Sequence, residues 1–199
     1  MTESEIRTNK ENFISIVRAN IKRDGIENLI DWLNKSDFFT TPSSTRFHGN
    51  YEGGLCEHSL NVYHVFKELL SKFDFPELHE EITDETITII TLFHDICKVF
   101  YYKLGTRNMK IDGKWETVQV YEVDDKLPLG HGEKSCMILQ RFMKLSINEL
   151  MAIRWHMGAF DFASKGGDRG YDLAGDKTQL VNLLHIADLI ASQLYEKAI

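Results

Sequence analysis

Proline and cysteine are scarce in this 199-residue chain, which contains three of each. The cysteines Cys56, Cys97 and Cys136 are odd in number, far apart and set in apolar segments, unlike a disulfide framework or a CxxC zinc knuckle. We therefore expect reduced thiols and a cytoplasmic protein. No proline-rich linker, repeat or low-complexity segment divides the chain, so we interpret residues 1–199 as a single domain.

The sequence also lacks a long apolar run and an excess of basic residues. No stretch approaches the roughly 18 apolar residues of a membrane span, and residues 1–13 lack the basic start and apolar block of a signal peptide. Lys and Arg number 23 against 30 Asp and Glu, for a formal net charge of −7. Because general affinity for nucleic acid depends on clustered Lys and Arg, we expect neither a membrane partner nor long duplex DNA.

Apolar residues recur at helical spacing through most of the chain, which predicts an all-α fold. The predicted helices cover residues 13–21, 26–35, 55–73, 85–99, 133–145, 147–157 and 178–198. Ser146 and Glu149 form a capping-box pattern before one of these helices, and Gly158 follows its end. Residues 38–54 interrupt the helical pattern and are predicted to form a loop.

A second interruption, residues 99–123, is rich in aromatic and β-branched residues. Asp112-Gly113 separates two alternating runs, which predicts a β-hairpin inserted into the helical domain. This hairpin is either a basic, aromatic lid for a nucleotide or single-stranded end, or a solvated element whose charges serve solubility. Its side chains of interest are Lys103, Arg107, Lys110, Lys114, Tyr101, Tyr102 and Trp115. Acidic residues dilute its basic charge, which favours a small nucleotide or short oligonucleotide over a long polymer.

Several ionisable residues fall on the apolar faces of the predicted helices. His94 and Asp95 are adjacent in a run that otherwise predicts a buried helix, while His58, His156 and Asp188 lie on inner faces or near a helix end. Burying a carboxylate is costly unless it is paired or bound to a cation, and basic residues on these faces are few. A divalent metal would satisfy imidazole nitrogens and carboxylate oxygens together, so the pattern predicts a metal site between helices.

The other histidines have more ordinary interpretations. His64 and His79 are predicted to be surface or structural residues. His185, one turn before Asp188, is interpreted in the same way, although it could donate a hydrogen bond to a ligand. His48, in the predicted loop, fits a substrate pocket and a structural role equally well.

The ordered set His58, His94-Asp95 and Asp188 resembles the H…HD…D signature of the HD superfamily of metal-dependent phosphohydrolases. The resemblance spans about residues 45 to 195 and is carried by "YEGGLCEHSLNVY", "LFHDICKVFYY", "GHGEKS", "IRWHMG" and "HIADLIAS", in that order. It implies an HD-domain helical bundle with an inserted hairpin, in which residues 1–40 form an N-terminal helical extension. The stretch "HGNYEGGLCEHSL" is also similar to the HD half of bacterial 3′-to-5′ exoribonucleases. The chain has no room for the OB-fold of those enzymes, so a small stand-alone HD hydrolase is the closer match.

The resemblance also implies roles for individual residues. Residues matching His58, His94, Asp95 and Asp188 bind a first metal ion in that family, and those matching His131 and His156 extend the site to a second, bridged by Asp95. Two divalent ions are therefore implied, of Mn, Fe, Ni, Co or Mg, and histidine-rich ligation favours a transition metal. Lys98, at the lysine position of the HDxxK motif, is expected to hold a phosphate oxygen. Further expectations place Arg46 and His48 in substrate binding and Glu133 in support of the metal ligands.

Two departures from the family pattern stand out. Many HD proteins have glycine where this chain has Cys97, a change that we expect to alter packing only. Some binuclear members have two consecutive histidines where this chain has Trp155-His156, which argues against a third metal ion.

The implied reaction is hydrolysis of a phosphate ester or anhydride of a nucleotide or short oligonucleotide by metal-bound hydroxide. Asp95 and Lys98 are the predicted catalytic residues. The alternatives are a 3′-to-5′ exonuclease or cyclic-dinucleotide phosphodiesterase, which share this chemistry, and a non-catalytic nucleotide-binding sensor of the HD fold. The complete ligand set with Lys98 weighs against the sensor. The sequence leaves the natural substrate and the oligomeric state open.

Overall fold

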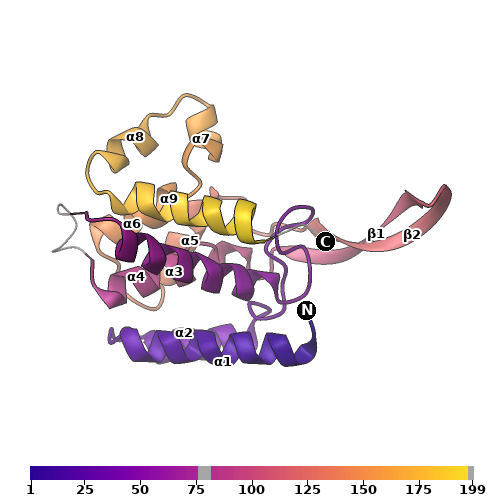
Figure 1. The fold of residues 1–199 in the computed structure, drawn as a ribbon, viewed down its shortest axis with the longest axis horizontal. Coiled ribbons are helices and arrows are strands. Elements are labelled where there is room, and N and C mark those ends of the chain that lie inside the picture. The colour runs from indigo at the N-terminus through magenta and orange to yellow at the C-terminus, as the bar shows by residue number, and fades with distance from the viewer. Residues whose placement is uncertain (76–81, 197–199) are drawn as a thin grey trace.

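The computed structural model describes residues 1–75 and 82–196 of the chain. Helices make up most of this part, and a two-stranded antiparallel hairpin projects from them (Figure 1). In chain order the elements are α1 (Glu3–Asn20), α2 (Ile26–Lys35), α3 (Gly54–Lys72), α4 (Asp84–Leu92), the 3-10 turn η2 (Ile96–Lys98), β1 (Tyr102–Ile111), β2 (Lys114–Val123), α5 (His131–Leu139), α6 (Ile147–Trp155), the 3-10 turn η3 (Gly158–Phe160), α7 (Phe162–Lys165), α8 (Gly170–Gly175), α9 (Leu180–Ile190) and the π-helical turn η4 (Ala191–Tyr195). The predicted fold class, a helical domain with an inserted hairpin, is confirmed.

Local sequence signals account for several helix starts. Thr2 and Glu5 form a capping box at the start of α1, and Ser146 and Glu149 form the predicted one before α6. Thr83 caps α4 by accepting a hydrogen bond from the backbone N–H of Thr86. These side chains satisfy N–H groups that the first turn of a helix leaves without a partner.

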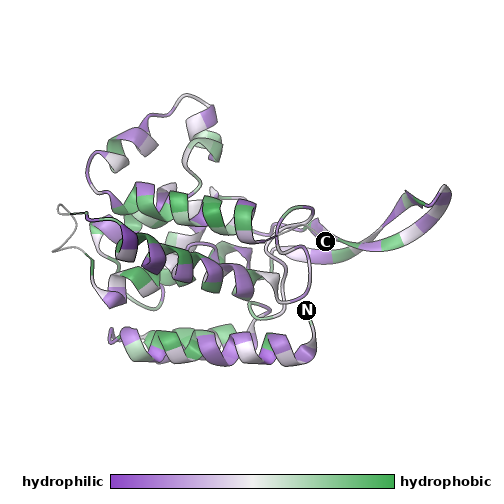
Figure 2. Cartoon of the chain, viewed as in Figure 1, coloured by the Kyte–Doolittle hydropathy of each residue, from purple (hydrophilic) through white to green (hydrophobic). Residues whose placement is uncertain are grey.

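The core lies between the helices. Helix α3 packs against α4 and α9, and α6 packs against α5 and α9 (Figure 1). In Figure 2, α2 and α9 carry many hydrophobic residues, whereas α1 and the hairpin carry more hydrophilic ones. Helix α1 is attached through Phe13, whose ring centroid lies 5.0 Å from that of Phe38 and 5.5 Å from that of Phe93. Helix α1 therefore contributes Phe13 to the apolar core, and the assignment of residues 1–40 to the same domain stays a prediction.

A buried ion pair ties the turn between α1 and α2 to the start of α6. The guanidinium of Arg23 donates to both carboxylate oxygens of Glu149, at 2.6 and 2.7 Å, and the Glu149 side chain is 0% exposed. Arg23 also pairs with Glu85 on α4, at 3.2 Å. Three segments far apart in the sequence are therefore fixed by one arginine.

The hairpin forms as predicted around Asp112-Gly113. Ile111 pairs with Lys114, and both turn residues have positive φ, 48° for Asp112 and 83° for Gly113. Such a two-residue turn matches the twist of the strands and suits an Asp-Gly sequence. Most side chains of β1 and β2 are exposed, and the strands extend away from the helices (Figure 1).

The prediction of one helix through residues 85–99 was wrong in its second half. Helix α4 ends at Leu92, and Phe93 and Asp95 have φ of −120° and −106°, outside the helical range. The Nδ1–H of His94 donates to the carbonyl of Thr91 at 2.7 Å, so the side chain takes over a backbone acceptor of the last helical turn. The predicted helix 133–145 is likewise shorter, since α5 stops at Leu139. The predicted helix 178–198 starts at Leu180 and becomes a π-helical turn after Ile190, and its residues 197–198 lie outside the described part of the chain.

Within the described residues, no helix combines the length and the apolar character needed to cross a membrane.

Candidate metal centre

Three helical segments bring His58, His94 and Asp188 together in the interior. His58 comes from α3, His94 follows α4, and Asp188 comes from α9, which lies beside α3 (Figure 1). The Nε2 atom of His58 lies 3.3 Å from Nε2 of His94 and 3.2 Å from Oδ1 of Asp188. Both histidines are at most 1% exposed. The convergence predicted from the helical faces is therefore present.

Asp95 lies between this group and a second group of histidines. Its Oδ2 is 3.8 Å from Nε2 of His58 and 3.5 Å from Nε2 of His94. Its Oδ1 is 2.8 Å from Nε2 of His131 and 3.4 Å from Nε2 of His156. The two oxygens of one carboxylate thus face two different sets of imidazoles.

The histidine tautomers suit metal binding. Nδ1–H of His94 donates to the Thr91 carbonyl and Nδ1–H of His156 donates to the Ile153 carbonyl, each at 2.7 Å. Burial lowers the pKa of His94 to about 4, so this ring is neutral and its Nε2 presents a lone pair to the cluster. Nε2 of His156 is buried and has no hydrogen-bond partner in the structure. A buried nitrogen without a partner is costly, and a metal ion would satisfy it, so these residues fit a divalent metal.

The charged groups of the cluster shift one another's pKa values. Burial alone would lower the pKa of His58, but the carboxylates of Glu196 and Asp188 outweigh it and raise the pKa to about 10. Burial opposes ionisation of Asp95, yet Lys98 and the neighbouring histidines hold its pKa well below the usual value. A bound cation would replace the proton on His58, so metal binding is coupled to proton release.

Comparison with known families agrees with this geometry. The family model of the HD domain matches residues 55–192, which is more than half of the chain and includes His58, His94, Asp95, His131, His156 and Asp188. The chain belongs to the HD domain family. HD domains are in general metal-dependent phosphohydrolases. No curated protein and no solved structure matches the chain, so the more specific similarity to exoribonucleases stays a prediction.

Glu196 is a member of the HD site that the sequence did not reveal. Its two carboxylate oxygens each lie 3.0 Å from Nδ1 of His58, and one of them also accepts from Asn61 at 3.0 Å. A carboxylate on the far nitrogen of a ligand histidine fixes the ring and raises its basicity. No regular spacing marks Glu196, because it follows the π-helical turn η4 with an extended backbone (φ −98°, ψ 114°).

Replacing Glu196 with glutamine is expected to weaken metal binding by roughly 10- to 100-fold, the usual effect of losing such a partner. The amide keeps the size and one oxygen but loses the charge that supports His58. Calorimetric titration with Mn²⁺ measures the change, with Glu68→Gln, an exposed glutamate on α3, as the control. Equal affinities in the two variants would contradict this role for Glu196.

Three residues were expected to bind substrate: Lys98, His48 and Arg46. Nζ of Lys98 lies 2.5 Å from Oδ2 of Asp95, and the lysine is 7% exposed. The His48 ring lies 4.8 Å from the His58 ring, and its Nε2 is buried without a partner. His48 and Lys98 therefore lie at the cluster. Arg46 is exposed on the same loop as His48, and its part in substrate binding stays a prediction.

His185 and Glu133 make contacts within the protein, and His64 lies at the surface. Nδ1–H of His185 donates to the carbonyl of His156 at 2.7 Å, which helps to position the ligand without binding metal. Glu133 pairs with Arg154 at 2.6 Å, and its support of the metal ligands stays a prediction. His64 is exposed, as predicted, and His79 lies outside the described residues.

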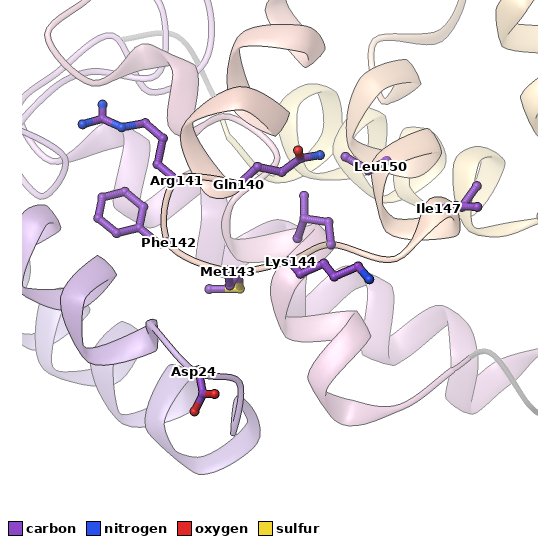
Figure 3. A pocket seen from close by; sticks show the side chains of 9 residues that line it. Asp24, Gln140, Arg141, Phe142, Met143, Lys144, Ile147 and Leu150 are labelled. Carbon is purple, nitrogen blue, oxygen red and sulfur yellow. The ribbon is translucent and has the colours of Figure 1, made fainter.

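A surface pocket of about 610 Å³ lies away from the cluster, between the α1–α2 turn, the end of α5 and the start of α6 (Figure 3). Its lining includes Asp24, Arg141, Lys144 and Leu150 but none of the clustered histidines. It brings together no set of metal ligands, so we place the chemistry at the His/Asp cluster.

Proposed function

We propose that this HD protein hydrolyses a phosphate ester or anhydride of a nucleotide or short oligonucleotide. The observation that carries the proposal is the position of Asp95, whose Oδ2 faces His58 and His94 while its Oδ1 faces His131 and His156. One carboxylate shared between two sets of imidazoles is the arrangement expected of a two-metal hydrolase.

Each residue has a defined part in this proposal. His58, His94, Asp95 and Asp188 would hold one ion, and His131 and His156 would hold a second that shares Asp95. Divalent ions at these positions would activate a water molecule and neutralise charge on the phosphoryl oxygens. Lys98, buried beside Asp95, adds a positive charge that can bind a phosphoryl oxygen of the substrate. His48, with a free buried nitrogen near His58, is positioned to hydrogen-bond the bound substrate.

A nucleotide is favoured over a simple phosphate by the aromatic residues at the base of the hairpin. Tyr101 lies with its ring centroid 6.5 Å from the His131 ring and 4.9 Å from the Tyr102 ring. An aromatic side chain this close to a phosphate-binding site can stack on a base. Lys134 lies 4.9 Å above the Tyr101 ring and is paired with Asp125 at 2.6 Å. The net charge of −7 disfavours a long polyanion.

The test is a hydrolysis screen with Mn²⁺-loaded protein. Substrates are bis(p-nitrophenyl) phosphate, nucleoside mono- and triphosphates, a cyclic dinucleotide and a short single-stranded oligonucleotide. We expect turnover of at least one nucleotide substrate by the wild type and by His64→Gln, and a loss of at least roughly 100-fold in His58→Gln. His58 and His64 lie on the same helix, but only His58 is buried in the cluster, so the pair separates the site from the helix.

The outcomes distinguish the alternatives. Preference for the oligonucleotide or the cyclic dinucleotide would indicate the exonuclease or phosphodiesterase. Nucleotide binding with no turnover in the presence of metal would indicate the sensor and refute hydrolysis. Equal activity in His58→Gln and His64→Gln would move the active site elsewhere.

A further inference from the structure

Cys97 lies in the metal cluster, where the sequence led us to expect only a packing role. Its sulfur, an oxygen of Asp95 and a ring nitrogen of His131 all lie within 4.8 Å of one another, and the cysteine is 3% exposed. The backbone N–H of Cys97 donates to Oγ of Ser135 at 3.2 Å, which ties η2 to α5, the helix that begins with His131. The position of the thiol relative to His131 is therefore held by the backbone.

An independent observation points to a ligand at the same place. Nε2 of His156 is fully buried, has no hydrogen-bond partner and lies 3.4 Å from the Asp95 oxygen that contacts His131. Its other nitrogen is already committed to the carbonyl of Ile153. The lone pair that remains faces Asp95 and the cluster, where a bound cation would satisfy it.

We propose that Cys97 is a thiolate ligand of the second metal position, together with Asp95, His131 and His156. The inference rests on the two-metal function proposed above and specifies the ion at one of its positions. Ligand bonds to zinc are about 2.0–2.3 Å long, so donor atoms around one tetrahedral ion lie roughly 3.3–4 Å apart. The donor atoms of Asp95, Cys97 and His131 lie within 4.8 Å of one another, so small side-chain shifts would bring them to these distances around one ion. On binding, the thiol releases its proton to solvent and the sulfur donates a lone pair to the ion.

A sulfur ligand determines which ions the position prefers. Thiolate is a soft ligand that favours Zn²⁺, Fe²⁺ or Co²⁺, whereas Mg²⁺ and Mn²⁺ prefer oxygen donors. The second position is therefore selective for borderline transition metals, while the first, built from imidazoles and carboxylates, is not restricted in this way.

The other two cysteines, Cys56 and Cys136, have surroundings unlike those of Cys97. Cys56 is packed in the apolar core, and the Cys136 thiol donates to the carbonyl of Leu150 at 3.6 Å.

The test is titration of the metal-free protein with Co²⁺, whose thiolate complexes give a charge-transfer band in the near ultraviolet. We expect one such band in the wild type and in Cys136→Ala, and its complete loss in Cys97→Ala and Cys97→Ser. Serine keeps the approximate size of the side chain, and circular dichroism checks that each variant is folded. In competition experiments, the preference for Zn²⁺ over Mn²⁺ should fall at least roughly tenfold in Cys97→Ser and stay unchanged in Cys136→Ala.

Each outcome bears on a different claim. Two results would overturn the thiolate ligand and leave the proposed function standing. The first is that the wild type shows the visible d–d bands of bound Co²⁺ but no charge-transfer band. The second is that the charge-transfer band persists in Cys97→Ala. Failure to bind any cobalt would overturn both.

Discussion

Replacing Asp95 with asparagine is expected to lower kcat/KM by roughly 10³-fold or more, because the charge that both metal positions share is lost. Asparagine keeps the size of the side chain and one acceptor oxygen, so packing changes little. The two oxygens of Asp95 face four imidazoles and Lys98. Asp188 also borders both histidine groups, because it lies 3.2 Å from Nε2 of His58 and within 4.8 Å of a ring nitrogen of His156.

Metal content by elemental analysis and kcat/KM on the best substrate should fall together in Asp95→Asn. The control is Asp172→Asn, an exposed aspartate on α8. Lys98 is left buried without its partner in Asp95→Asn, so far-ultraviolet circular dichroism must show that the variant is folded. Full activity with normal metal content in Asp95→Asn would refute the shared carboxylate.

Replacing Glu149 with alanine is expected to lower the free energy of unfolding by about 1.5–3 kcal/mol, the usual contribution of hydrogen bonds to a charged group, because Arg23 is 24% exposed and keeps its pair with Glu85. Arg23 would lose a bidentate partner that is 0% exposed, and Thr86 would lose the acceptor of a 3.1 Å hydrogen bond. Urea unfolding followed by circular dichroism measures the change. Glu27→Ala is the matched control, because Glu27 pairs with Arg18 on the surface and should leave stability nearly unchanged.

Glu149→Ala should also change how the free energy of unfolding depends on pH. Burial would raise the pKa of Glu149, but its bonds to Arg23 and to the backbone of Ser146 hold the pKa below the ordinary value of 4.5. A lowered folded-state pKa stabilises the protein above the unfolded value, and this stability is lost as the pH falls through the folded pKa. Glu149→Ala should therefore lose less stability than the wild type on acidification below about pH 4.5. Parallel losses in the two proteins would contradict the ion pair as the cause.

The sequence predicted those parts of the site that depend on regular periodicity. His58 and Asp188 lie in the interiors of α3 and α9, so the helical faces correctly predicted that they point inward. The hairpin was predictable because Asp112-Gly113 is a local signal that needs no tertiary contact. The break after Leu92 was not, because it depends on a side-chain hydrogen bond from His94 within a run that is apolar on every side.

Residues that act through tertiary contacts were the ones missed. Glu196 reaches His58 across 138 positions of sequence, and nothing near it marks this contact. Cys97 was expected to affect packing because its neighbours are apolar, yet its sulfur lies beside Asp95 and His131.

The early end of α4 explains how two adjacent residues can serve one cluster. In an unbroken helix, consecutive side chains diverge by about 100° and do not face each other. Nε2 of His94 and Oδ2 of Asp95 nevertheless lie 3.5 Å apart. The backbone is irregular from residue 93 to residue 95, and this irregularity lets the donor atoms of His94 and Asp95 face the same cluster. Substitutions that strengthen helix formation between residues 93 and 98 would separate these donors, even if every donor atom were retained.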